Sequence, residues 1–257
     1  MKFLFFSDLD NTLIYSSRHI LPKEKRVVEY KEGRELSSMT EKTFKFLEQL
    51  QAHQEVMLVP LTTRTVEQYQ RIEVFQKELL CKFALVCNGA ILLEENQINR
   101  SWEKESLDMA GNQLEELERA YDKMASFIDQ SHLKMVRSLL AYGISENPEE
   151  CCATLETSID STKIDVFYNS RKVYCIPKAF SKGMAVIRFR ERYPTEIAVG
   201  AGDSSLDVSM LSACEYSFGS EKIARRISRC NLLPLYGEFA LNDILHLEAV
   251  DNKKNTD

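Results

Sequence analysis

The sequence predicts an α/β fold, with a Rossmann-like, doubly wound parallel sheet as the core and a smaller α+β domain inserted into it. Four short apolar runs end in polar residues and alternate with helical patterns, which is typical of parallel sheets. The runs are Phe3–Phe6, Val56–Leu61, Phe83–Val86 and Ile197–Val199. Ligands of such folds bind at the carboxyl ends of the strands, so we expect the four polar ends to share one edge.

Capping patterns and apolar spacing indicate the helices between these runs. Ser38-Met39-Thr40-Glu41 fits a capping box and precedes an apolar face from Phe44 to Leu50. Thr65-Val66-Glu67-Gln68 repeats the pattern, and a second apolar face extends from Val66 to Leu79. Both segments are predicted to be core helices.

Residues 89–179 interrupt this alternation. They contain a short apolar run at 91–93, helical patterns near 114–128 and 149–159, and two strand-like runs at 164–168 and 173–176 that predict a hairpin. We therefore predict a core formed by residues 1–88 and 180–257 and an inserted α+β unit formed by residues 89–179. Residues 251–257 are polar and are expected to form a flexible tail.

Composition narrows the class of protein. The chain has 257 residues, of which 44% are hydrophobic, enough for a full core and a smaller second unit. A net charge of -6 argues against nucleic acid or anionic membranes as partners, and no apolar run approaches the ~18 residues of a membrane span. The seven cysteines are expected to be free. We expect a cytoplasmic monomer or small homo-oligomer that binds a small solute.

Asp8 and Asp10 are the first candidate catalytic residues, because they follow directly on the Phe3–Phe6 run. Two aspartates two residues apart in a turn can point into one pocket. One can then serve as nucleophile and metal ligand and the other as general acid and base. The pattern therefore predicts an enzyme.

Three further polar clusters follow the other runs. Thr62, Thr63 and Arg64 follow the second run, Asn88 follows the third, and Gly202-Asp203-Ser204-Ser205-Leu206-Asp207 follows the fourth. Lys182 stands in Ser181-Lys182-Gly183, before a helical pattern. Taken singly, each cluster is compatible with ordinary turn, capping or surface chemistry.

Taken in order, Asp8-x-Asp10-Asn11-Thr12, Thr62, Lys182 and Gly202–Asp207 resemble the four motifs of the haloacid dehalogenase (HAD) superfamily of aspartyl-phosphate phosphatases. Asn88-Gly89-Ala90 and the insert after it resemble the Cof-type and sucrose-phosphatase-like branch, whose cap follows the third core strand. The resemblance covers nearly the whole chain. It departs from the usual pattern at Thr63, where many relatives have Gly, and at Leu206, where they have Asn.

The resemblance implies a role for each candidate. Asp8 would attack phosphorus, Asp10 would protonate the leaving group, and Lys182 would offset the charge of the phosphoryl group. Mg2+ would be held by Asp8, Asp203 and the backbone carbonyl of Asp10, with Asp207 binding through water or orienting Lys182. By the resemblance, Thr62 would donate a hydrogen bond to the phosphoryl oxygens. Thr63, Arg64 and Asn88 are further candidates on the substrate side, with two alternatives left open: a surface ion pair for Arg64 and a turn-capping role for Asn88.

The resulting hypothesis is a Mg2+-dependent phosphatase that acts on a small phosphorylated metabolite, with a sugar phosphate as the leading substrate. Two alternatives remain open: a phosphomutase, which would return the phosphoryl group to the sugar, and a non-catalytic binding or regulatory protein on the same fold. A dehalogenase is disfavoured because the Asp10 acid suits an oxygen leaving group better than a halide.

Overall fold

The structure, a computed structural model, describes residues 2–247. The described residues form two compact units, one made of residues 2–98 and 182–247 and the other of residues 99–181. The predicted tail, 251–257, lies outside the described residues. Among the described residues, no helix is both long and apolar enough to cross a bilayer.

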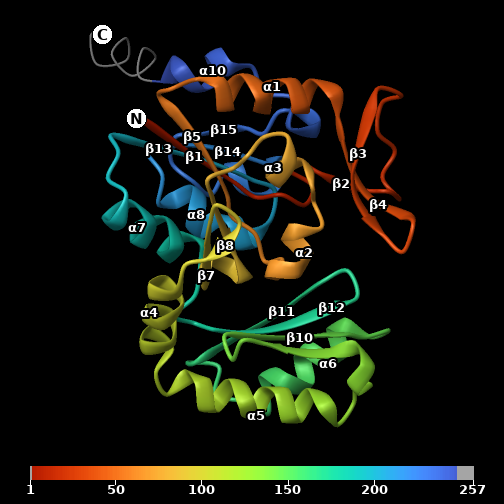
Figure 1. The fold of residues 1–257 in the computed structure, drawn as a ribbon. Helices are drawn as coiled ribbons and strands as arrows, with labels where there is room; N and C mark the ends of the chain where they lie inside the picture. Colours follow the sequence, from red (N-terminus) through yellow and green to blue (C-terminus); the bar gives the residue numbers. More distant parts are fainter. Residues whose placement is uncertain (1, 248–257) are drawn as a thin grey trace. The chain divides into compact units, whose positions relative to one another are not determined.

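A five-stranded parallel sheet forms the core of the first unit, in the order β15-β14-β13-β1-β5 (Figure 1). Its strands are β1 (Phe3–Ser7), β5 (Val56–Pro60), β13 (Ile197–Gly202), β14 (Tyr216–Gly219) and β15 (Cys230–Leu232). All five residues of β1 are buried. The predicted α/β class is confirmed.

Helices cover both faces of this sheet. The ring of Phe5 packs edge-on against Phe46 of α1 (Glu41–Ala52) at 5.9 Å between centroids. The ring of the next residue, Phe6, packs against Phe189 of α7 (Lys182–Arg192) at 5.6 Å. Because successive side chains of a strand point to opposite faces, α1 and α7 lie on opposite sides of the sheet (Figure 1).

The remaining helical segments of this unit are short. They are α2 (Val66–Gln70), α3 (Val74–Lys77), α8 (Val208–Ser212), α9 (Glu221–Ala224), α10 (Leu241–Leu245) and the 3-10 turns η1 (Cys87–Gly89), η3 (Ser205–Asp207) and η4 (Leu235–Gly237).

The two predicted caps had different outcomes. The capping box at Thr65 and Gln68 is confirmed, but the single helix expected from Val66 to Leu79 is wrong, because it is interrupted between α2 and α3. At this interruption Ile72 forms a β-bridge with Glu29. The capping box at Ser38 is also wrong: Ser38 lies in a strand, and Thr40 caps α1 by accepting a hydrogen bond from the Thr43 amide.

A β-hairpin between Asp10 and α1 was not predicted from the sequence. It forms a three-stranded sheet of β2 (Tyr15–Ser16), β4 (Arg34–Thr40) and β3 (Lys25–Lys31). Its turn is made by Glu32 and Gly33, with φ of 52° and 75°. Consecutive positive φ values are typical of the tight turns that join antiparallel strands.

A second small sheet follows the core strand β5. It contains β6 (Phe83–Val86), β7 (Ile91–Glu94) and β8 (Gln97–Ile98). The third apolar run therefore lies in this small sheet and meets the end of β5 through a bridge between Leu61 and Leu85 and adjacent backbone hydrogen bonds. Because β7 and β8 pair with β6 and not with the insert, residues 89–98 group with the first unit, whereas the predicted cap began at residue 89.

The second unit is α+β. Its antiparallel sheet has the order β11-β12-β10-β9, with β9 (Leu133–Val136), β10 (Leu140–Ile144), β11 (Ile164–Asn169) and β12 (Lys172–Pro177). Its helices are α4 (Arg100–Ala110), α5 (Gln113–Ala125), α6 (Pro148–Glu156) and the turn η2 (Gln130–His132). Buried residues of α5, α6 and the sheet, including Leu117, Leu155 and Val173, form its core.

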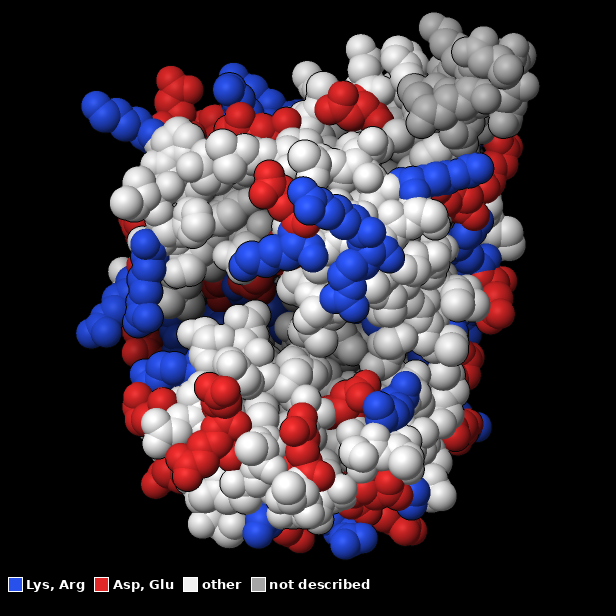
Figure 2. Space-filling model, turned by 180° about the vertical axis from the view of Figure 1, so that it is seen from behind, with Lys and Arg blue, Asp and Glu red and all other residues white. Residues whose placement is uncertain are grey.

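The seven cysteines are free, as predicted. On the molecular face drawn in Figure 2, basic and acidic side chains are both present. This agrees with a net charge of only -6 for 257 residues.

Candidate active site

Asp8 and Asp10 lie in the turn that leaves β1, the core strand between β13 and β5. The Asp8 amide donates to the Ala201 carbonyl at 2.9 Å, which continues the pairing of β1 with β13. The chain then turns sharply through Asn11, whose φ is 59°. Asp8 is buried, whereas the side chain of Asp10 is 40% exposed.

Asp203 and Asp207 follow β13, the neighbour of β1. One carboxylate oxygen of Asp207 accepts from the amides of Asp203 and Ser204, at 3.1 and 2.9 Å, and from the Ser204 hydroxyl at 2.8 Å. Gly202 permits this close approach, since a Cβ at this position would lie 2.5 Å from the Cβ of Asp207. Asp207 therefore organises the loop that carries Asp203.

Lys182 joins these two turns. It is the first residue of α7, its side chain is 2% exposed, and its Nζ donates to Asp8 Oδ1 at 2.7 Å and to Asp207 Oδ1 at 2.6 Å. Carboxylate oxygens of Asp8, Asp203 and Asp207 lie within 4.8 Å of one another. The structure thus brings four of the predicted site residues together at the carboxyl ends of β1 and β13.

Burial and neighbouring carboxylates raise the pKa values of Asp8 and Asp203. Burial, with repulsion by Asp207 and Asp10, raises the pKa of Asp8 from 3.8 to about 8 although Lys182 opposes the shift. Burial and repulsion by Asp207 raise the pKa of Asp203 from 3.8 to about 6. Burial lowers the pKa of Lys182, but attraction by Asp207 and Asp8 outweighs burial, and the net shift is upward.

This donor set fits a hard divalent cation. Mg2+ prefers oxygen ligands, above all carboxylates, and a cation would relieve the repulsion that adds to burial in raising the pKa values of Asp8 and Asp203. Both carboxylate oxygens of Asp207 are engaged by protein donors, one by Lys182 and the other by the Asp203–Ser204 turn. Asp8 and Asp203 are therefore the better-placed ligands.

Thr62 and its neighbours lie at the end of β5. Thr62 is fully buried, its amide donates to the Leu85 carbonyl at 2.9 Å, and its hydroxyl accepts from the Arg64 amide at 3.2 Å. Thr63 is half-buried. Asn88 is buried with a φ of 59°, and its amide donates to the Thr62 carbonyl at 2.9 Å. The ends of β5 and β6 are thus joined by backbone hydrogen bonds.

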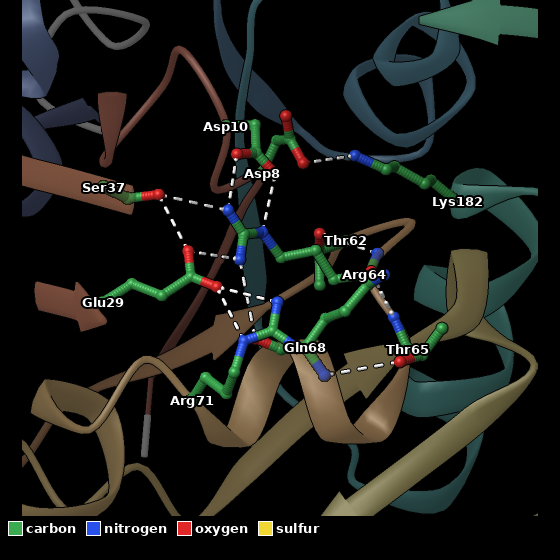
Figure 3. A network of polar contacts seen from close by, with 10 residues as sticks. All are labelled: Asp8, Asp10, Glu29, Ser37, Thr62, Arg64, Thr65, Gln68, Arg71 and Lys182. Carbon is green, nitrogen blue, oxygen red and sulfur yellow. Dashed lines mark hydrogen bonds and ion pairs between the residues drawn. The ribbon is translucent and has the colours of Figure 1, made fainter. Parts of the chain in front are cut away.

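The structure brings Asp10 together with Arg64. The Arg64 guanidinium donates from Nε to Asp10 Oδ2 and from Nη2 to Asp10 Oδ1, both at 2.8 Å (Figure 3). The other side of Arg64 faces Glu29, a buried residue of β3 that the sequence did not single out. The sequence offered one signal for Glu29: its carboxylate directly follows Val27 and Val28 in a strand-like run.

A parallel α/β core with an inserted α+β unit, and an acidic cluster beside a lysine at the ends of its central strands, define a phosphatase of the HAD type. The sequence model of the sucrose-6F-phosphate phosphohydrolase family matches residues 1–218, and the chain belongs to this family. The protein is therefore an enzyme of the HAD phosphatase group, as the resemblance implied.

Solved structures agree with this fold. The sucrose-phosphatase from Synechocystis sp. PCC6803, in complex with sucrose and phosphate, has a TM-score of 0.61 at 14% identity, covering 98% of each chain. A HAD subclass IIB sugar phosphatase has a TM-score of 0.61 at 14% identity, covering 97% of this chain and 100% of that one. Trehalose-6-phosphate phosphatase from Aspergillus fumigatus has a TM-score of 0.52 at 14% identity, covering 92% and 91%. No curated protein sequence matches the chain.

Proposed function

We propose that this protein is a Mg2+-dependent phosphatase that hydrolyses a small sugar phosphate through an aspartyl-phosphate on Asp8. One observation carries the proposal: Asp8 is held by Lys182 beside Asp203 and Asp207, at the carboxyl end of β1. A buried carboxylate fixed in this way is oriented for attack before substrate arrives. Preorganised nucleophiles and charges of this kind are what phosphoryl transfer requires.

The residues present fit Mg2+. Asp8 and Asp203 would hold the ion, while Asp207 fixes the Asp203 turn and the Lys182 ammonium. When bound, the ion supplies positive charge that offsets the charges of the nucleophile and the phosphoryl oxygens.

The chain's own residues divide the remaining chemistry. An oxygen of Asp8 forms a bond to phosphorus while the bond from phosphorus to the leaving oxygen breaks, and Asp10, which enters this step as the protonated acid, gives that oxygen its proton. Asp10 then takes a proton from the water that attacks the aspartyl-phosphate, which releases inorganic phosphate and restores Asp8. Lys182, which already contacts Asp8 Oδ1, offsets charge during both steps. Thr62, at the end of β5, is the candidate hydroxyl donor to the phosphoryl oxygens.

Family membership supports a sugar phosphate as the substrate class, because the family takes its name from the hydrolysis of sucrose-6F-phosphate. The similar Synechocystis enzyme was solved with sucrose and phosphate, the two products of that reaction. A sugar hydroxyl is a poor leaving group, so this substrate class depends strongly on a general acid such as Asp10.

A phosphate-release screen tests the proposal. Purified protein with Mg2+ is assayed on sucrose 6F-phosphate, trehalose 6-phosphate, other sugar phosphates, nucleotides, phosphoserine and flavin mononucleotide. We expect the highest kcat/KM among the sugar phosphates. Asp8→Asn should abolish release while the melting curve stays close to wild type, and the exposed Asp108→Asn on α4 serves as the matched control.

Two results would refute the proposal. Release by Asp8→Asn at near-wild-type rate would refute the covalent route. Conversion of a sugar phosphate to an isomer without free phosphate would identify a phosphomutase instead.

A further inference from the structure

Arg64 binds Asp10 through two parallel hydrogen bonds. Its Nε and Nη2 each lie 2.8 Å from a different carboxylate oxygen of Asp10 (Figure 3). Bidentate pairs between a guanidinium and a carboxylate fix orientation as well as distance, because two bonds in one plane prevent rotation of the carboxylate. The partly exposed Asp10 side chain is thereby held in one position.

The rest of the Arg64 guanidinium is directed at protein acceptors. Nη1 donates to Glu29 Oε2 at 2.9 Å and approaches the Gln68 carbonyl at 3.5 Å, and Nη2 approaches the Ser37 hydroxyl at 3.4 Å. A guanidinium has five N–H groups in a fixed plane. All three of its nitrogens contact acceptors of the protein, so Arg64 is arranged to hold Asp10 and not to receive a phosphate.

Glu29 contacts the side of the Arg64 guanidinium that does not face Asp10. Its side chain is 1% exposed. Its Oε2 accepts from Arg64 and from the Ser37 hydroxyl at 2.8 Å, and its Oε1 accepts from Nε and Nη2 of Arg71 at 3.2 and 3.0 Å. A buried carboxylate is tolerated when it is paired and hydrogen-bonded, and Glu29 meets both conditions.

We propose that Glu29 is a positioning residue for the general acid, acting through Arg64 on Asp10. The inference rests on the proposed function, because it takes Asp10 as the proton donor. A shift of about 1 Å in a catalytic group can cost up to about a hundredfold in rate. A single side chain, the largely buried Arg64, links the two carboxylates, so a change at Glu29 is transmitted to Asp10 through one rigid guanidinium.

The hairpin gives this arrangement its position in the fold. Glu29 lies on β3 and Ser37 on β4, both between Asp10 and Thr62 in the sequence, and Arg71 ends α2. The hairpin places the Glu29 carboxylate against the Arg64 guanidinium, on the side away from Asp10. Anchoring Arg64 to this hairpin and to α2 couples the acid to two elements of the first unit.

A variant series separates positioning from mere stability. Glu29→Gln removes the charge and keeps the size of the side chain, and Ser37→Ala is a milder change that removes one hydrogen bond to Glu29. Arg26→Gln is the control, because Arg26 anchors the same strand β3 elsewhere, through Glu41, Glu78 and the ring of Phe44. It loosens the hairpin without touching Arg64.

The readout is kcat/KM on two substrates that differ in leaving group. Para-nitrophenyl phosphate has an activated leaving group that needs little help from an acid, whereas a sugar phosphate needs a proton. We expect Glu29→Gln to lose about 10- to 100-fold more on the sugar phosphate than on para-nitrophenyl phosphate. Ser37→Ala should show a smaller difference in the same direction, and Arg26→Gln should show none.

A double-mutant cycle with Asp10→Asn completes the test. If Glu29 acts through Asp10, adding Glu29→Gln to Asp10→Asn should cause no further selective loss on the sugar phosphate. Equal losses on both substrates, additive losses in the cycle, or the same selectivity in Arg26→Gln would each overturn the inference. A wild-type protein that hydrolyses neither substrate would overturn the proposed function itself, which is a distinguishable result.

Discussion

Lys182 donates to Asp8 across 2.7 Å, although 174 residues separate the two in the chain. The same ammonium lies 2.6 Å from Asp207, so one buried cation is shared by two carboxylates. This contact joins the turn after β1 to the start of α7 and the turn after β13. It links the nucleophile candidate to the loop that carries the second metal-ligand candidate.

Lys182→Met should therefore reduce both stability and activity. Removing one partner of a buried ion pair leaves an uncompensated charge, which typically costs about 3–5 kcal/mol of the free energy of unfolding. Urea denaturation in EDTA measures this loss, and phosphate release measures the loss of catalysis. An unchanged urea midpoint would contradict the shared-cation arrangement.

The double variant Lys182→Met with Asp207→Asn provides the control. It removes one negative charge along with the positive one, and an asparagine oxygen can still accept from the Asp203 and Ser204 amides. Part of the stability should return while the enzyme remains inactive. This outcome would separate the electrostatic contribution of Lys182 to folding from its contribution to phosphoryl transfer.

The stability of the metal-free protein should fall as pH rises from about 4 to 8. The pKa of Asp8 is raised from 3.8 to about 8 and that of Asp203 from 3.8 to about 6, so the folded state retains protons that the unfolded state releases. Stability therefore decreases with pH across this window. Melting temperatures in EDTA at several pH values, at constant ionic strength, measure the slope.

Mg2+ should reverse this trend, because it competes with protons for the same carboxylates. At a hundred times its Kd, a ligand of the folded state adds about 2.7 kcal/mol to the free energy of unfolding. We expect this gain near pH 8 and a smaller one near pH 5, with an equal ionic strength of KCl as the control. A stabilisation by Mg2+ that does not depend on pH would contradict the acidic cluster as its binding site.

Gly237→Ala should destabilise the protein and impair the turn that carries Asp10. Gly237 has a φ of 68°, and a Cβ there would lie 2.3 Å from the carbonyl oxygen of Thr12. Gly33→Ala is the matched control, since Gly33 has a φ of 75° and nothing lies within 4 Å of its added Cβ. Backbone strain alone should cost each variant about 1–2 kcal/mol.

The difference between the two glycine variants isolates the contact with Thr12. Gly237→Ala should show the lower melting temperature and a reduced kcat, whereas Gly33→Ala should keep a kcat close to wild type. Equal melting temperatures and equal kcat values would mean that the Tyr236–Gly237 turn does not support the loop after β1.

Local sequence signals predicted the parallel core and the positions of Asp8 and Asp203, whereas Lys182 was singled out by the family resemblance. Asp8 follows an apolar strand, Asp203 follows another, and adjacent parallel strands present their carboxyl ends together. Ser38 shows the limit of such signals: its spacing to Glu41 fits a capping box, yet pairing of β4 with β3 keeps it in a strand. Strand pairing between distant residues overrode the local preference.

The sequence by itself determined which residues leave the ends of the core strands, because apolar periodicity and turn chemistry are local properties. Only the tertiary structure decided which groups those residues meet. Asp10 pairs with Arg64, 54 positions away, and Arg64 with Glu29, 35 positions away. These pairings depend on a hairpin that turns back onto the end of β5. Packing between distant segments sets such hydrogen bonds, and the spacing of residues within one segment does not.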